Sequence, residues 1–235
     1  LGDVYKRQVS VADANTISGK TTGAVTATIA TGSFNDLNAL NETNNVYALN
    51  LNETISVANA NTLNGKTTGV ITATITAGNY AAVNALNGTG NAYAVTVNDQ
   101  ITVAEADVLA AKTTGVVTAT LSTGDMATLA GLNETGNAYT ITITDTSATA
   151  AALTALDAKT TVAVAAGNVT SISGNATEVK AAYAADAATT IVLDGDEAVS
   201  VSGTVSVADA NIISGKTSGA VTATIATGSY TELNA

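Results

Sequence analysis

The sequence predicts an α/β fold, a solenoid of 22–24-residue coils in which each strand is followed by a short helix and the strands form one parallel sheet. Three observations predict it. A five-residue word with alternating threonine and apolar residues recurs at 25–29, 71–75, 117–121 and 221–225. Short segments with helical apolar spacing and N-cap residues lie between the strands. The whole pattern repeats at intervals of about 46 residues.

The strand segments alternate polar and apolar residues and are rich in β-branched side chains, which is typical of half-buried strands. Their expected starts are Val25, Tyr47, Ile71, Tyr93, Val117 and Tyr139. Successive side chains of a strand point to opposite faces, so the apolar set should point inward and the threonines outward. The expected outward threonines are Thr26, Thr28, Thr72, Thr74, Thr118, Thr120, Thr140, Thr142, Thr222 and Thr224.

The inward positions predict how neighbouring strands fit together. When the strand starts are aligned, small and large residues alternate at the middle inward position. Ala27 should then lie beside Leu49, and Ala73 beside Val95. Such complementary packing explains a period of 46 rather than 23 residues.

Two kinds of short helix are expected between the strands. Ser10, Thr102 and Ser206 are N-cap candidates, each with an acidic residue three positions later. The second kind has apolar residues three apart over 34–40, 80–86 and 126–132. One strand and one short helix cannot bury an apolar face alone, so stacked units are expected. A crossover through a helix makes neighbouring strands parallel and is right-handed by rule.

A longer period lies above the 46-residue one. Residues 9–39 and 205–235 match at 26 of 31 positions, at an offset of 196. We therefore divide the chain into regular coils over 9–162, irregular coils over 163–204 and the start of a further module over 205–235. Residues 1–8, "LGDVYKRQ", break the pattern and resemble an adapter-derived end of a translated metagenomic assembly, so we predict that they are not native. We expect the chain to be a fragment of a longer repeat protein.

Composition excludes several classes of function. The 235 residues include no His and no Cys, and the net charge is −11. Zinc and nucleophile chemistry therefore lack their usual side chains, and no enzyme activity, catalytic residue or cofactor is expected. A nucleic-acid partner is disfavoured because phosphate binding needs clustered Lys and Arg. The apolar runs are too short for membrane insertion.

The outward threonines are the first candidate binding surface. Their Thr-x-Thr spacing resembles the arrays of ice-binding β-solenoids, which implies a face that binds ice or another ordered surface. Threonine also has a high β propensity, so a merely solvated strand face is the alternative.

An acidic cluster, Asp194, Asp196 and Glu197, is a candidate calcium site because calcium prefers several oxygen ligands around a flexible turn. The alternative is a solvated turn. Lysines recur once per unit near a helix C-terminus, where they suit the end carbonyls. The alternative is a row of lysines that binds a ligand. The recurring lysines are Lys20, Lys66, Lys112, Lys159 and Lys216.

The word "VSVADANTISGKTTGAVTATIATG" and the acidic, lysine-poor composition of residues 9–235 resemble the repeats of giant secreted cell-surface proteins of bacteria, particularly marine cyanobacteria. The coil length is similar to that of leucine-rich repeats, without their Asn-ladder consensus. The resemblance implies an extracellular or cell-surface extender, such as an adhesin stalk or surface-layer segment. Its partners would be neighbouring repeats, and the alternatives are a surface glycan, ice or another surface protein.

Overall fold

A computed structural model describes residues 8–228, so the octapeptide 1–8, apart from Gln8, and the last seven residues of 205–235 lie outside the described residues. The chain forms two compact units. The first comprises residues up to Asp99 together with Glu105–Ala119. The second comprises Gln100–Ala104 together with residues from Thr120 onward.

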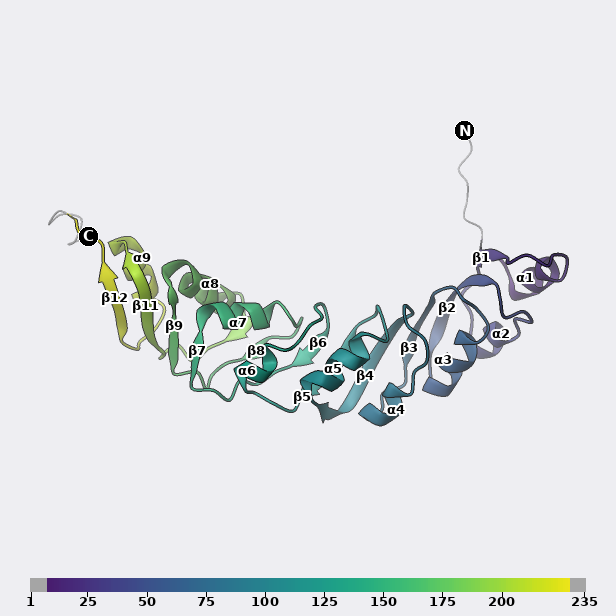
Figure 1. Ribbon diagram of the computed structural model, residues 1–235, viewed down its shortest axis with the longest axis horizontal. Helices are drawn as coiled ribbons and strands as arrows, with labels where there is room; N and C mark the ends of the chain where they lie inside the picture. Colours follow the sequence, from purple (N-terminus) through teal and green to yellow (C-terminus); the bar gives the residue numbers. More distant parts are fainter. Residues whose placement is uncertain (1–7, 229–235) are drawn as a thin grey trace, which may run out of the picture. The chain divides into compact units, whose positions relative to one another are not determined.

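Short helices and strands alternate as far as residue 140, and beyond it two strands can follow one another with no helix between them (Figure 1). The elements up to the end of α5 are α1 (Val11–Ser18), β1 (Thr26–Thr28), α2 (Phe34–Asn38), β2 (Val46–Ile55), α3 (Val57–Asn64), β3 (Ile71–Ile75), α4 (Tyr80–Asn84), β4 (Ala92–Ile101) and α5 (Val103–Ala110). They are followed by β5 (Val117–Leu121), α6 (Met126–Leu129), β6 (Ala138–Thr140), β7 (Ser147–Thr149), α7 (Ala150–Asp157), β8 (Val164–Ala165), β9 (Ser171–Asn175), α8 (Ala176–Ala187), β10 (Ile191–Val192), β11 (Ala198–Val205), α9 (Val207–Ser214) and β12 (Val221–Ile225).

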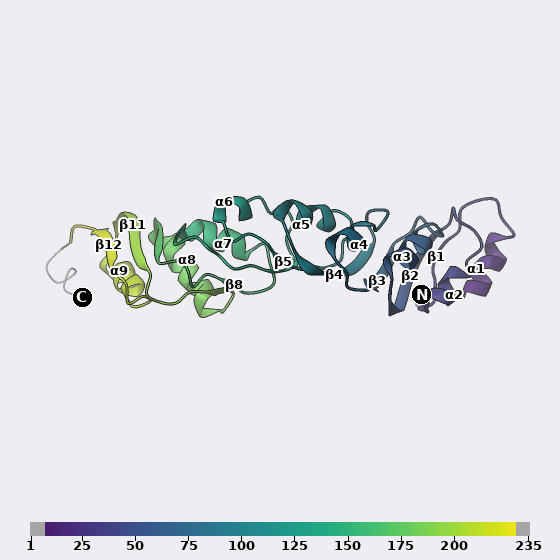
Figure 2. The same cartoon turned by 90° about the horizontal axis from the view of Figure 1, so that it is seen from below.

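The prediction of an α/β fold with parallel strands is confirmed, but within residues 8–228 the strands form three sheets rather than the single sheet that was expected. Strands β1 to β6 form one sheet in chain order. The pairs β1–β2, β2–β3 and β3–β4 are parallel. Within the second unit, β12, β11, β9 and β7 form a four-stranded parallel sheet, and β10 pairs with β8. In that unit α7 contacts α8 and α8 contacts α9, in chain order (Figure 2).

The helix starts follow the predicted caps. The Ser10 side chain accepts a hydrogen bond from the Asp13 N–H, and Ser206 does the same for Asp209. Ser33 and Asp36 form a full capping box at the start of α2. The hydrogen bonds from Ser33 hold the pKa of the Asp36 carboxyl below its usual range. These caps allow helices of only five to eight residues to form.

The predicted inward and outward positions are confirmed by burial. In β3, Ile71, Ala73 and Ile75 are buried, whereas Thr72 and Thr74 are exposed. β4 and β5 alternate in the same way. The core is therefore built from the apolar set of each strand together with one apolar side of the helices.

The predicted register between strands is wrong. Ala27 lies opposite Tyr47 rather than Leu49, and Ala73 lies opposite Tyr93 rather than Val95. Leu49 instead pairs with Ile71 on its other side. The tyrosine rings are among the largest buried side chains, and in both pairs the residue opposite the tyrosine is alanine, which has a small side chain. The small–large complement is real, but it joins Ala to Tyr.

A buried threonine sets this register. The Thr67 hydroxyl accepts hydrogen bonds from the N–H groups of Tyr47 and Gly69, at 2.8 and 2.9 Å, and lies 2.8 Å from the Tyr47 carbonyl oxygen. A side chain thus takes the place of a backbone partner where β2 approaches the turn before β3. Thr113 makes the same contacts with Tyr93 and Gly115.

A buried asparagine completes each turn. Asn45 accepts from the Val25 N–H at 2.7 Å and donates to Ser18, and Asn91 accepts from the Ile71 N–H at 2.9 Å. Although the leucine-rich consensus is absent, buried asparagines 46 residues apart therefore satisfy strand backbone groups.

Within residues 8–228 the buried hydroxyl of Tyr93 has no hydrogen-bond partner, and burial raises its pKa to about 12. Replacing Tyr93 with Phe removes this unsatisfied group. It should lower the free energy of unfolding by no more than about 0.5 kcal/mol and can raise it. Tyr47→Phe is the matched control, because the Tyr47 hydroxyl lies 3.5 Å from the Ala14 carbonyl oxygen. Urea unfolding of both variants measures the difference. A loss above about 1 kcal/mol in Tyr93→Phe alone would contradict the assignment.

Candidate functional site

The outward positions of the parallel strands present the predicted threonines, of which Thr222 and Thr224 lie on β12 of the four-stranded sheet and the others lie in or beside the six-stranded sheet. Of the ten, all are exposed except Thr120, which is half-buried. Their hydroxyl and methyl groups therefore face solvent, as the alternation in the sequence requires. Whether this face binds anything stays a prediction.

The threonines of the first unit do not form an unbroken ladder. Thr72 lies between Asn50 of β2 and Ala92 of β4. On β1, Thr28 pairs with Ala48. With strands about 4.8 Å apart, one Thr-x-Thr pair is thus followed by the next after about 9.6 Å. The face is a set of separated hydroxyl rows with small, uncharged side chains between them.

The acidic cluster at the candidate calcium site does not converge. The carboxylates of Asp194 and Asp196 belong to exposed residues, whereas Glu197 is fully buried. Within residues 8–228, no group of three or more acidic side chains is placed to hold a metal ion. The glutamate turns inward, away from the solvent that a calcium site at a turn would use.

Glu197 occupies the position that tyrosine holds in the regular repeats. Thr217 donates to the Glu197 carbonyl oxygen at 2.7 Å, as Thr67 does to that of Tyr47. The glutamate carboxylate accepts from the Gly195 N–H at 2.9 Å and from the Tyr183 hydroxyl at 3.2 Å. A tyrosine supplied by α8 thus compensates for the tyrosine missing from the strand. Burial, and then the nearby Glu197, raises the pKa of Tyr183 well above its usual value.

Three of the recurring lysines bind carbonyl groups of the neighbouring strand–helix coil. The ammonium of Lys66 donates to the Leu40 carbonyl just after α2, at 2.9 Å. Lys112 makes the same bond to Leu86 after α4, at 3.0 Å, and Lys159 to Asn133 after α6, at 3.0 Å. The prediction that lysines satisfy helix-end carbonyls is confirmed for these three, but the helix is the short one before their own.

Carboxylates at the same 46-residue spacing bind the other end of these helices. Glu53 accepts from the Phe34 N–H at 2.6 Å, Asp99 from the Tyr80 N–H at 2.8 Å and Asp145 from the Met126 N–H at 2.6 Å. Sequence reasoning missed this pairing. The signal was present, because the three acidic residues stand 46 residues apart and each follows an alternating segment that is expected to form a strand. In the structure Glu53 and Asp99 lie within β2 and β4.

Removing one lysine contact should weaken the fold without altering charge elsewhere. Lys66→Met keeps the aliphatic chain but leaves the half-buried Leu40 carbonyl without its partner, at a cost of about 1–2 kcal/mol in the free energy of unfolding. The matched control is Lys20→Met, since Lys20 is exposed at the equivalent position of the first repeat. Chemical denaturation of both variants measures the effect. Equal stability of the two would argue against this role.

An ion pair joins two helices of the second unit. Lys180 on α8 contacts Asp209 in the first turn of α9. The Lys180 ammonium, and then the Ser206 hydroxyl, hold the pKa of the Asp209 carboxyl below its usual range. The carboxylate is exposed enough that we assign the pair to helix positioning rather than to binding.

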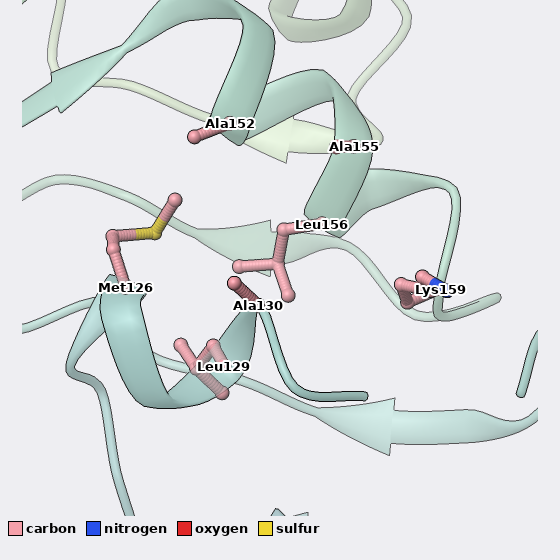
Figure 3. A pocket seen from close by; sticks show the side chains of 7 residues that line it. All are labelled: Met126, Leu129, Ala130, Ala152, Ala155, Leu156 and Lys159. Atoms are coloured by element: carbon pink, nitrogen blue, oxygen red, sulfur yellow. The ribbon is translucent and has the colours of Figure 1, made fainter. Parts of the chain in front are cut away.

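A small apolar hollow lies between α6 and α7 (Figure 3). Met126 and Leu129 line one side, and Ala152, Ala155 and Leu156 line the other. Alanine stands at two positions where the earlier unit has Glu105 and Val108, so the hollow follows from shorter side chains. Lys159 also lines the hollow, and its ammonium donates to the Asn133 carbonyl.

The described helices include none that is long and apolar enough to cross a bilayer. No protein-family model, curated protein or solved structure matches the chain.

Proposed function

We propose that the chain is a structural repeat segment of a large extracellular or cell-surface protein. Its 22–24-residue coils would stack as a right-handed α/β solenoid and act as an extender without catalysis. The observation that carries this proposal is the use of charged side chains at 46-residue spacing. Three carboxylates bind helix starts and three lysines bind helix ends, in each case in the neighbouring strand–helix coil. They are Glu53, Asp99 and Asp145, and Lys66, Lys112 and Lys159.

This arrangement suits an extender for a physical reason. At α2 and α4, a carboxylate accepts from the first N–H of the helix and a lysine donates to a carbonyl just after it. Both residues come from the next strand–helix coil along the chain. Each unit therefore gains stability from its neighbours, and length can increase by adding copies. The net charge of −11 favours solubility and keeps separate chains apart.

Length measurement tests the extender. A protein carrying two tandem copies of residues 9–204 should exceed one copy in maximum dimension by about 40 Å, which corresponds to roughly eight strand layers 4.8 Å apart. Small-angle X-ray scattering measures this dimension. Growth of the radius of gyration as for a compact sphere would refute stacking.

A second candidate function is binding of ice or another ordered surface by the outward threonines. The exposure of Thr26, Thr28, Thr72, Thr74 and Thr118 beside small uncharged neighbours favours it. A thermal-hysteresis assay tests the face. Thr118→Tyr should abolish hysteresis, whereas Thr62→Tyr on α3 should leave it unchanged, because Thr62 is exposed on a helix. Absence of hysteresis in the unaltered protein would exclude ice.

A further inference from the structure

Six Asn-x-Thr triplets occur in the sequence, and the proposed extender role makes no use of them. This triplet is the acceptor motif for N-linked glycosylation, in which the asparagine amide receives a sugar and the third residue supplies a hydroxyl group. All six asparagines are exposed, so exposure alone does not distinguish them. They are Asn41, Asn52, Asn87, Asn133, Asn168 and Asn175.

Three of the triplets lie in the turn between a short helix and the next strand. Asn41 follows α2, Asn87 follows α4 and Asn133 follows α6. All three residues of each triplet are exposed and lie outside helices and strands. These three, which we call the turn triplets, therefore present the whole motif to solvent.

The turn triplets are anchored by their backbone. The Asn41 N–H donates to the Asn15 side chain at 3.0 Å, and the Asn87 N–H donates to the Asn61 side chain at 2.7 Å. Within residues 8–228, the side-chain amides of Asn41 and Asn87 have no hydrogen-bond partner, and neither do the threonine hydroxyls of their triplets. The groups that a transferase recognises are thus available in these two turns without any change in the fold.

Two other triplets use their side chains to hold the fold. The Asn168 amide donates to the Ile143 carbonyl at 2.8 Å, and the Thr170 hydroxyl donates to the Thr146 carbonyl at 3.1 Å. Asn175 is the N-cap of α8, where its side chain accepts from two N–H groups of the first turn. A transferase would have to break these hydrogen bonds before it could act on either asparagine.

The sixth triplet belongs to a strand. Asn52 lies in β2, and its N–H donates to the Gly32 carbonyl at 3.2 Å. The Glu53 carboxylate accepts from the Phe34 N–H, and Thr54 is paired with β3. Every residue of this triplet is therefore held by neighbouring backbone, and the motif can leave the sheet only by local opening.

We propose that the three turn triplets, with Asn41, Asn87 and Asn133 as acceptors, are sites of N-linked glycosylation of the folded chain, whereas the other three triplets are not. The inference rests on the proposed function, because this modification belongs to surface turns of chains that reach the cell exterior. A bulky, hydrated sugar on these turns would add to the solubility of the segment.

The reaction needs a sugar activated as a phosphate ester, which is either a nucleotide sugar or a lipid-linked oligosaccharide. The asparagine Nδ2 forms a bond to the anomeric carbon of the sugar. The bond from that carbon to the phosphate oxygen breaks, and the phosphate leaves with the electron pair. The amide releases one proton, and nothing is oxidised or reduced.

The rate of modification at each asparagine of the folded full chain tests the assignment. One arm uses UDP-glucose with a soluble transferase that recognises Asn-x-Thr, and the other uses a lipid-linked oligosaccharide with a membrane oligosaccharyltransferase. Mass spectrometry of proteolytic fragments measures each site. Synthetic peptides that contain each triplet give the rate for the same sequence without the fold.

We expect the turn triplets to react within about threefold of their peptides, because no contact has to open first. The other three triplets should react at least about tenfold more slowly than their peptides, because each requires local opening of the fold. The arm that modifies the turn triplets identifies the class of donor.

Substitutions in one turn separate recognition of the motif from simple exposure. Thr89→Val should abolish modification of Asn87 and leave that of Asn41 unchanged, because the motif requires a hydroxyl group at its third position. Thr89→Ser is the matched control and should retain modification of Asn87. Thr89 is exposed in a turn, so both variants should keep the circular dichroism spectrum of the unaltered chain.

Three results would overturn the inference. They are turn triplets that are slowed by the fold as much as the other three, turn peptides that neither enzyme accepts while it modifies a standard acceptor peptide, and unchanged modification of Asn87 in Thr89→Val. If tandem copies lengthen as expected but the turn triplets stay unmodified, the extender function stands and these acceptor sites do not.

Discussion

Gly69→Ala is expected to destabilise the protein by about 3 kcal/mol, which lowers the melting temperature by roughly 6–12 °C. A Cβ at this position would lie 2.4 Å from the Tyr47 carbonyl oxygen and 3.0 Å from its nitrogen. These are backbone atoms of a paired strand, so they cannot move aside as a flexible side chain would. Differential scanning calorimetry measures the loss.

The control for this substitution lies one repeat earlier. Gly23 occupies the same place in its "TTG" turn, but among residues 8–228 a Cβ there would meet the Thr21 hydroxyl alone, at 3.5 Å. Gly23→Ala should therefore stay within about 0.5 kcal/mol of the unaltered protein. Similar losses for both variants would mean that backbone conformation, rather than the approach of β2, requires glycine.

Thr67→Val should cost about 2–4 kcal/mol in the free energy of unfolding. Valine has nearly the same shape, but it leaves the N–H groups of Tyr47 and Gly69 without an acceptor in a buried position. Urea unfolding at constant m-value measures the change.

Two variants separate the hydrogen bonds from packing at Thr67. Thr67→Ser keeps the hydroxyl and should recover most of the stability. Thr21→Val changes the same position of the first repeat, where the residue is exposed and, among residues 8–228, its hydroxyl accepts from the Gly23 N–H. It should cost less than about 1 kcal/mol. A Thr67→Ser variant as unstable as Thr67→Val would contradict the role of the hydroxyl.

The sequence was sufficient for the α/β class, for parallel strand pairing and for the two sides of strands such as β3. Alternation in "ITATI" predicts that Ile71 and Ile75 are buried and that Thr72 and Thr74 are exposed, because side chains of a strand alternate. Ser10 and Ser206 predict helix starts, because a hydroxyl can bind a free N–H group. Both rules depend only on residues close in the chain.

The register between strands could not be read in this way. Aligning strand starts placed Ala27 beside Leu49, but the structure pairs it with Tyr47. The register depends on two features that are distant in sequence. One is the volume of the tyrosine ring, and the other is the Thr67 hydroxyl, which binds the Tyr47 N–H from 20 residues later. A periodic pattern specifies which face a residue takes, but not how far one strand slides along another.

The same distinction between local pattern and distant contacts explains which parts of the candidate site could be predicted. The outward threonines follow from alternation alone. Glu197 does not, because a glutamate in "LDGDEA" suggests a solvated turn, whereas its burial depends on Tyr183 of α8. The lysines were assigned to helix ends correctly, but their partners 26 residues back lie on another helix.

The shared caps of α2 and α4 have a consequence for how the chain folds. A helix of five residues does not persist in water, since its nucleation costs more than one turn returns. Asn15 of α1, which precedes α2 in the chain, and Glu53 and Lys66, which follow it, bind the ends of α2. That helix should therefore form only once the strand–helix coils on both sides are in place. Folding should therefore need a nucleus of about three consecutive strand–helix units and then proceed by growth at its edges. A chain shortened below that length should lose its structure in one step rather than by degrees.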